Sequence, residues 1–190
     1  MAIHAFELLH NISAVKDNYL ANHQKNVSRI SVLTAEYIGL NNELKNIVQT
    51  SALFHDIGKI NIPNSILFKP TDLTDREWVI MKQHPITGAE IFHLEKHKDN
   101  PDFSSVVRVI LHHHERWDGE GYPYGLKGEN IPLGSRIIAI TDAFDAMTTD
   151  RPYRKRMSTE EACQEILKCA AKQFDPYLVE RFIEIIRDLY

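Results

Sequence analysis

Apolar residues recur every three or four positions along most of the chain, which is the spacing of amphipathic α-helices. No stretch alternates between apolar and polar residues over a length that would predict a β-strand. The pattern predicts helices near residues 3–12, 23–39, 42–55, 74–84, 86–94 and 101–114, and three more that begin near residues 135, 158 and 176. We therefore predict an all-α bundle of about seven to nine helices.

Polar residues at the expected helix starts support these boundaries. Asn41 can act as an N-cap, and Thr74 and Ser158 each stand three residues before a Glu, as in a capping box. Ser135 is expected to cap the helix that follows it. Between them, residues 115–134, the Gly-rich loop, show no helical period but contain Trp117, Tyr122 and Tyr124. A long loop that keeps its aromatic residues indicates a functional segment.

Length and composition predict one globular domain spanning residues 1–190, with neither internal repeats nor a visible domain boundary. A net charge of −4 gives no basic field for polymeric nucleic acid or for a membrane surface. The sequence has no apolar run of 18 residues, and its beginning lacks the features of a signal peptide. Two isolated cysteines fit a reducing compartment, so we expect a cytoplasmic protein.

Ten histidines are present, and the pair His55-Asp56 stands where a helical pattern ends. A neutral imidazole beside a carboxylate suits a divalent metal such as iron, manganese or zinc. Gly58 permits a tight exit from the helix, and Lys59 returns a positive charge to the same neighbourhood. Alone, the pair is better explained as a helix end with a capping His and a solvated Asp, so the metal hypothesis depends on the rest of the chain.

Seven His and Asp residues share such positions at helix ends or on apolar helical faces. Individually, a His of this kind is more often a core residue that has found a hydrogen-bond partner. Together, five imidazoles and two carboxylates suffice for two metal ions that share a carboxylate. The seven residues are His23, His55, Asp56, His84, His113, His114 and Asp142.

Five motifs resemble the HD-GYP family, the cyclic dinucleotide phosphodiesterases of the HD superfamily. They are LFHDIGKI, MKQHPITG, HHHERWDGEGYP, RIIAITDAFDAM and RPYR, and the match runs from about residue 16 to 179. The resemblance implies a single HD-superfamily helical domain and a role in bacterial second-messenger signalling. It also implies that the seven residues bind metal, with Asp56 as the bridge, and that His112 is not a ligand.

One departure from the family pattern bears on the metal count. Members with three metals carry a Glu four residues before His23, and this chain has Tyr19 there. Because a phenol is a poor substitute for a carboxylate ligand, we predict two metal ions. Iron or manganese is expected, with zinc, nickel and cobalt left open. Asn26 stands where the family often has Arg, a difference that we interpret as neutral.

The resemblance also implies roles around the substrate. Lys59 is expected to stabilise charge on the phosphoryl oxygens. Arg151 and Arg154 of RPYR would clamp a substrate phosphate, and Lys69 would add positive charge. Tyr122 either stacks on a guanine or packs the loop. The Gly-Tyr-Pro element is also expected to contact a diguanylate cyclase (GGDEF) domain.

The expected activity is hydrolysis of cyclic di-GMP to linear pGpG, with further conversion to GMP left open. One alternative keeps the metals and changes the substrate to 3′,3′-cyclic GMP–AMP. Another is a non-catalytic module that binds a cyclic dinucleotide or a partner, although every expected ligand position is filled. A nucleotide triphosphohydrolase of the wider superfamily would leave the Gly-Tyr-Pro element and RPYR unexplained.

Overall fold

The computed structural model describes residues 18–94, 101–150 and 155–189, and within these ranges the regular elements are helices, with one isolated β-bridge between Ala170 and Phe174. The α-helices are α2 (Asn18–Tyr37), α3 (Asn42–Phe54), α4 (Asn64–Leu67), α5 (Asp75–Met81), α6 (His84–Leu94), α7 (Pro101–Leu111), α8 (Leu133–Thr148), α9 (Thr159–Lys168) and α10 (Pro176–Leu189). Two 3-10 helices, η1 (Ile57–Asn61) and η2 (Gly128–Asn130), complete them. The all-α prediction is confirmed, while the helix expected near residues 3–12 lies outside the described residues.

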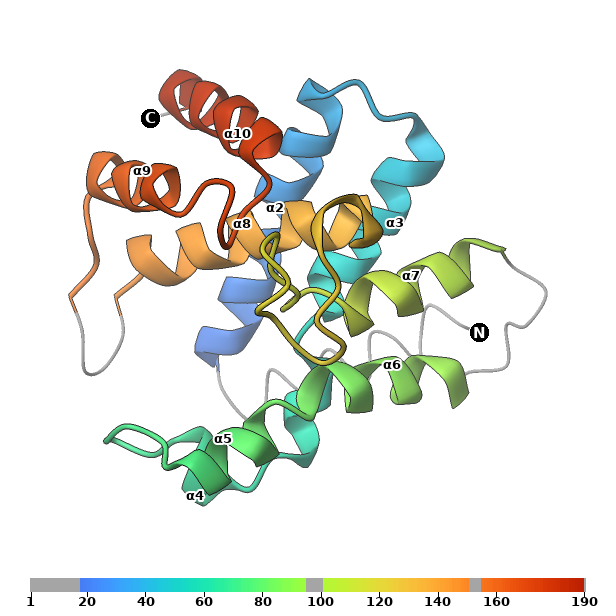
Figure 1. Cartoon of the computed structure of the whole chain (residues 1–190), viewed down its shortest axis with the longest axis vertical. Coiled ribbons are helices and arrows are strands. Elements are labelled where there is room, and N and C mark those ends of the chain that lie inside the picture. Colours follow the sequence, from blue (N-terminus) through green and yellow to red (C-terminus); the bar gives the residue numbers. More distant parts are fainter. Residues whose placement is uncertain (1–17, 95–100, 151–154, 190) are drawn as a thin grey trace.

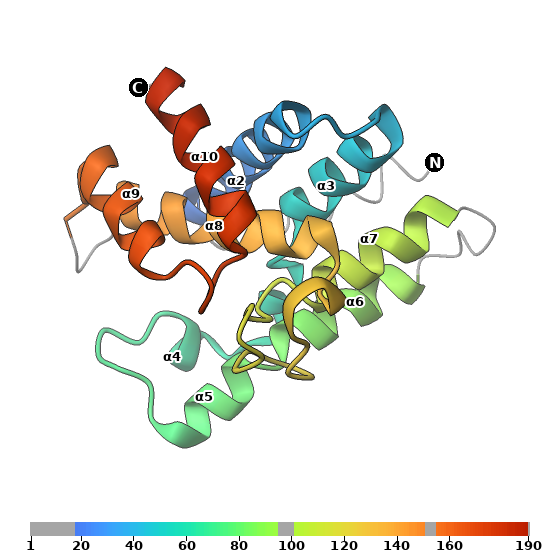
Figure 2. The ribbon, with the colours of Figure 1, turned by 45° about the horizontal axis from the view of Figure 1, so that its top comes forward.

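Helix α8 runs through the middle of the bundle and packs against helices on both sides (Figure 1). On one side, α2, α8, α9 and α10 enclose a hydrophobic cluster that includes Phe144 and Phe182. On the other, α3, α6 and α7 enclose a second cluster around Phe92 and Ile110, which Ile138 of α8 joins. Figure 2 shows the same division, with α9 and α10 on one side of α8 and α6 and α7 on the other. Each cluster buries apolar faces that the sequence period predicts.

Three of the four predicted caps are confirmed. The Asn41 side chain accepts a hydrogen bond from the Leu44 amide at 2.9 Å, and Thr74 and Ser158 form capping boxes. The prediction for Ser135 is wrong, because α8 already begins at Leu133. The Ser135 hydroxyl is buried and donates to the Val109 carbonyl oxygen at 2.9 Å, so it joins α8 to α7.

Gly58 permits a close approach between η1 and α6. A Cβ atom on this residue would lie 2.0 Å from the carbonyl oxygen of His84 and 2.6 Å from the amide nitrogen of Gly88. Any side chain would therefore push η1 away from α6. The glycine thus keeps the residues just before η1 next to the first turn of α6.

Within the described ranges, no helix is long and apolar enough to cross a lipid bilayer.

Candidate metal centre

The seven residues predicted as ligands converge on one place from five parts of the fold. His23 comes from α2, Asp142 from α8, and His84 is the first residue of α6. The other four follow directly after α3 or α7. Two sets of side chains bring one ligand atom per residue within 4.8 Å of each other, and both contain Asp56: the first set is Asp56, His84, His113 and His114, and the second is His23, His55 and Asp56.

Asp142 borders the second of these sets. Its Oδ1 lies 3.1 Å from Nε2 of His23 and 3.9 Å from Nε2 of His55. The structure therefore brings together all seven residues that the sequence singles out. Asp56 is the residue common to both sets, as a carboxylate that bridges two cations would be.

Three histidines are oriented in the same way by the backbone. The Nδ1 atoms of His55, His84 and His113 lie 2.7, 2.8 and 2.6 Å from the carbonyl oxygen of the residue three positions earlier. A carbonyl oxygen only accepts hydrogen bonds, so each Nδ1 carries the ring proton and donates it. Each Nε2 then keeps a lone pair directed into the centre, which is the tautomer that a metal ligand needs. We refer to these three as the backbone-held histidines.

The inward-facing atoms of this group lack the partners that buried polar atoms normally have. Nε2 of His84 and Nε2 of His113 face each other at 3.3 Å, and both are lone-pair atoms in this tautomer. Nε2 of His55 and Oδ1 of Asp56 are buried without a hydrogen-bond partner in the described part of the chain. Converging lone pairs without donors are unfavourable by themselves and fit a bound cation.

The protonation states also suit a cation. Burial, together with the charge of Lys59, lowers the pKa of His84 to about 3, so this imidazole is neutral. Burial likewise lowers the pKa of His114 to about 3. For Asp56, burial would raise the pKa, but the charge of Lys59 and the surrounding histidines together outweigh burial and hold the pKa of this carboxyl well below its usual range. Neutral imidazoles and an ionised carboxylate are the forms that bind metals.

His23 is held differently, by side chains of α8. Its Nδ1 lies 2.6 Å from Oδ2 of Asp145, and its Nε2 lies 3.1 Å from Oδ1 of Asp142. Burial lowers the pKa of His23, but hydrogen bonds to Asp142 and Asp145 outweigh it and raise the pKa to about 9. These two carboxylates therefore stabilise positive charge at this edge of the centre. We call His23, Asp142 and Asp145 the α2–α8 side.

The ring of His114 is fixed by stacking. In the part of the chain that the structure describes, its side chain makes no hydrogen bond, and its ring lies over Tyr122 with centroids 4.9 Å apart and planes 29° apart. The His84 ring meets it edge-on, also at 4.9 Å. One role expected for Tyr122, that of a packing residue, is thus visible directly beside a candidate ligand.

The Gly-rich loop owes its position to a carboxylate that the sequence analysis does not single out. Glu115 is buried and accepts hydrogen bonds from the backbone amides of Tyr124 and Leu126, at 2.8 and 3.0 Å. The neighbouring His112 lies 3.6 Å from Glu115 and belongs to neither set of candidate ligands. Sequence pattern alone gives no signal for Glu115, because one carboxylate after three histidines looks the same whether buried or solvated.

The remaining predicted residues differ in what the structure shows. Lys59 places Nζ 2.6 Å from Oδ2 of Asp56, at the edge of the centre. Lys69 is paired with Glu77 of α5 at 2.6 Å, so much of its charge is neutralised there. Arg151 and Arg154 lie outside the described residues.

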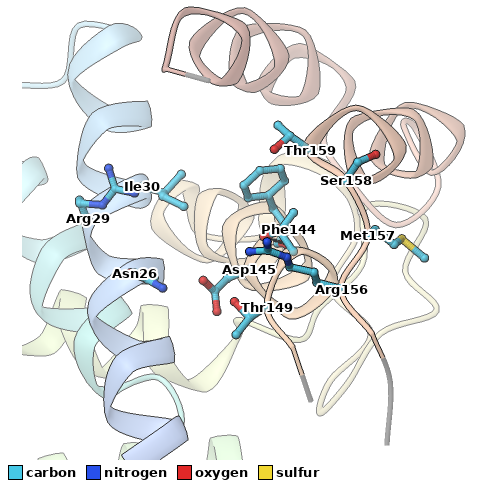
Figure 3. A pocket seen from close by; sticks show the side chains of 11 residues that line it. Asn26, Arg29, Ile30, Phe144, Asp145, Thr149, Arg156, Met157, Ser158 and Thr159 are labelled. Atoms are coloured by element: carbon cyan, nitrogen blue, oxygen red, sulfur yellow. Dashed lines mark hydrogen bonds between the residues drawn. The ribbon is translucent and has the colours of Figure 1, made fainter. Parts of the chain in front are cut away.

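In the described part of the chain, two pockets adjoin the centre. One of about 670 Å³ lies between α2, α8 and the segment before α9, and includes Asn26, Asp145 and Arg156 (Figure 3). It reaches the back of the α2–α8 side through Asp145. The other, of about 550 Å³, is bordered by α5 and the Gly-rich loop and includes His114 and Tyr122. Both volumes are in the range of small-molecule sites.

Residues 7–178 match the model of a protein family described as the HD domain. A cyclic di-GMP phosphodiesterase of Thermotoga maritima is 39% identical over 183 residues, which cover 96% of this chain and 49% of that protein. The 3′3′-cGAMP-specific phosphodiesterase 2 of Vibrio cholerae is 34% identical over 182 residues, which cover 94% of this chain and 34% of that protein. The chain thus spans about half or less of the length of these relatives.

Solved structures share the fold. An HDG"Y"P protein from Bdellovibrio bacteriovorus aligns with a TM-score of 0.70 at 21% identity, over 88% of this chain and 52% of the other. The HD domain of the L. monocytogenes phosphodiesterase PgpH, in complex with cyclic-di-AMP, aligns with a TM-score of 0.60 at 17% identity, over 96% of both chains.

Proposed function

Because the chain belongs to the HD domain family, in its HD-GYP branch, we propose that it is a metal-dependent phosphodiesterase that hydrolyses cyclic di-GMP to linear pGpG. The observation that carries this proposal is the position of Asp56 in both sets of candidate ligands, where the unpartnered atoms of His55 and Asp56 fit a cation. The name of the relative from T. maritima supports the substrate. Family membership itself implies binding of divalent metal.

The proposed cofactor is a pair of divalent transition-metal ions, with iron or manganese favoured and zinc, nickel or cobalt as alternatives. One ion would be held by His84, His113 and His114. The other would be held by His23, His55 and Asp142, and Asp56 would contribute to both sites. Such a pair, when bound, supplies a hydroxide near neutral pH and polarises the phosphodiester.

The protein's own contribution begins with Lys59. Its ammonium group lies against Asp56 and its side chain is 24% exposed, so a phosphate bound at the centre could reach it. A fixed positive charge there would stabilise the charge that grows on the phosphoryl oxygens. The carboxylate of Asp56 keeps Lys59 in place, so one residue orients both the cations and the catalytic ammonium group.

Further substrate contacts are part of the proposal. Arg151 and Arg154 are proposed to clamp the second phosphate, and Lys69 contributes a weaker field because Glu77 is paired with it. Tyr122 offers at most one ring face to a guanine, since the other lies on His114.

We also propose that the Gly-Tyr-Pro element docks a GGDEF-domain partner. A cytoplasmic location is supported by the free thiols of Cys163 and Cys169.

A second candidate substrate is 3′,3′-cyclic GMP–AMP. The name and 34% identity of the V. cholerae relative favour it, and the metal chemistry would be the same. The choice between the two depends on contacts to the bases.

Parallel assays of the purified chain separate these possibilities. The protein, loaded with Mn²⁺ or anaerobically with Fe²⁺, is incubated with each cyclic dinucleotide, and the products are resolved by chromatography. We expect cyclic di-GMP to be linearised to pGpG, and the same run shows whether GMP follows. Faster cleavage of cyclic GMP–AMP would favour the second candidate, and inertness toward both would contradict the proposal.

A further inference from the structure

The pocket beside His114 is lined in part by an exposed tryptophan that adds little to the hydrophobic core. This residue, Trp78, lies in α5, and 45% of its surface is exposed. Helix α5 has no buried residue, and its Val79 and Ile80 are also exposed, so Trp78 contributes little to either hydrophobic cluster. An indole that the core does not require, beside a candidate phosphodiesterase centre, offers a flat surface on which a nucleobase can stack.

The same pocket contains charged groups that form no ion pair with the described residues. Lys82, one turn after Trp78, holds its ammonium group 5.5 Å from the Tyr122 ring centroid and forms no ion pair in the described ranges. The carboxylates of Asp75 and Glu120, which also line the pocket, likewise form no ion pair there. Arg116 differs, because Asp118 binds its guanidinium at 3.1 and 2.6 Å. The pocket therefore presents one available cation and two available carboxylates around an exposed indole.

This set of groups matches guanine. The base offers acceptors at O6 and N7, which suit an ammonium group, and donors at its N1 and N2 positions, which suit a carboxylate. Adenine has a donor group at N6 but lacks the adjacent donors at N1 and N2, so it would leave at least one of the two carboxylates unpaired. Because His114 belongs to both the pocket and the candidate ligand set, a base here and a phosphate at the metals can belong to one nucleotide.

We propose that this pocket binds one guanine base of the substrate, stacked on Trp78, with Lys82 and the carboxylates of Asp75 and Glu120 reading its edge. The inference rests on the proposed function and deepens it. It assigns base recognition mainly to α5, while Tyr122 packs against His114.

The first test compares Trp78→Ala with Ile80→Ala, an exposed position of the same helix that does not line the pocket. Two substrates are used: cyclic di-GMP, and the cyclic diribose bisphosphate that lacks both bases, a phosphodiester without any aromatic ring. Trp78→Ala should raise the KM for cyclic di-GMP about tenfold, because the guanine base would lose the aromatic ring on which it stacks. It should leave cleavage of the baseless diester unchanged, as Ile80→Ala should for both substrates. Trp78→Phe, which keeps a stacking surface, should lie in between.

The second test addresses the carboxylates. The double variant Asp75→Asn/Glu120→Gln should lower the preference for cyclic di-GMP over cyclic di-AMP, measured as the ratio of kcat/KM values, by about fivefold or more. An unchanged ratio would contradict the proposal that these carboxylates accept hydrogen bonds from the guanine base.

The outcomes separate this inference from the proposed function. If the wild-type chain cleaves cyclic di-GMP and Trp78→Ala does so with the same KM, the pocket assignment is wrong and the proposed function stands. If Trp78→Ala loses both substrates equally, Trp78 has a structural role and the assignment is again wrong. If the wild-type chain cleaves only the baseless diester, both proposals fail.

Discussion

The backbone-held histidines and His23 of the α2–α8 side are both oriented through Nδ1, but by different kinds of partner. His55, His84 and His113 each donate Nδ1–H to a carbonyl oxygen only three residues away. His23 is oriented by Asp145, which is 122 residues distant in the sequence. The first arrangement follows from placing a His just at a helix end. The second exists only once α2 and α8 have packed.

This difference determines which of the hydrogen bonds that orient the histidines can be removed by a mutation. No substitution deletes the carbonyl oxygens of Ala52, Met81 and Ile110, so the backbone-held histidines are robust to changes around them. The α2–α8 side depends on one side chain, and His114 depends on the ring of Tyr122. We therefore expect sensitivity outside the ligands themselves to concentrate at Asp145 and, more weakly, at Tyr122.

The largest effect is expected at Asp56, the residue common to both sets of candidate ligands. Asp56→Ala should abolish hydrolysis of cyclic di-GMP and reduce bound metal, because both sets of ligands lose their common carboxylate. Lys59 would also lose its partner at 2.6 Å. Metal content by mass spectrometry and activity are measured on the same preparation. A variant that stayed active with two metals would show that Asp56 is not the bridge.

A smaller effect, confined to the α2–α8 side, is expected at Asp145. Asp145→Ala should lower metal affinity or activity about 10–100-fold, the usual cost of removing a residue that orients a metal-bound imidazole. Asp145→Asn keeps an acceptor oxygen for Nδ1–H of His23 but loses the charge, so it should lose less. Chelator competition measures the affinity. Equal losses in both variants would mean that charge, and not orientation, is the contribution of Asp145.

The stacking of His114 should produce the next smaller effect. Tyr122→Leu removes the ring beneath His114 and should weaken metal binding about two- to tenfold, as expected for loss of one ring pair. Tyr122→Phe keeps the ring and is the matched control, with metal affinity expected to equal that of the unmodified chain. If Phe proved as damaging as Leu, the hydroxyl group and not the stacking would be what matters.

His112 should give the smallest effect of all. It is adjacent to two candidate ligands but faces Glu115 and Tyr124 instead of the centre. His112→Gln should therefore leave metal content unchanged and affect at most the stability of the Gly-rich loop. Loss of a metal ion in this variant would show that the wrong pair of the His triplet has been assigned to the centre.

The same contrast explains what the sequence can predict. Caps at Asn41, Thr74 and Ser158 depend on residues three positions apart, so a local pattern finds them. Ser135 fits the same local pattern of a cap, but its hydroxyl donates to the Val109 carbonyl oxygen instead. That contact forms only when α7 and α8 pack together, so a local pattern cannot predict it. His113 and His114 are expected on the face of a helix, whereas the helix ends at Leu111 and they occupy the turn after it.

The candidate ligands could be listed from the sequence because their motifs are distinctive, but their arrangement could not be derived. The 2.0 Å clash that any side chain at Gly58 would make with His84 is invisible in the sequence. The burial of Glu115 beneath the Gly-rich loop and the exposure of Trp78 are equally hidden, because both depend on which helices meet. The roles of Arg151 and Arg154 stay predictions.

The central claim is that two metal ions share Asp56. Anomalous diffraction from crystals of the metal-loaded chain, recorded on both sides of the metal absorption edge, tests it most directly. We expect two peaks, one beside His84, His113 and His114 and one beside His23, His55 and Asp142, with Asp56 between them. A single peak, or peaks elsewhere in the chain, would contradict the account.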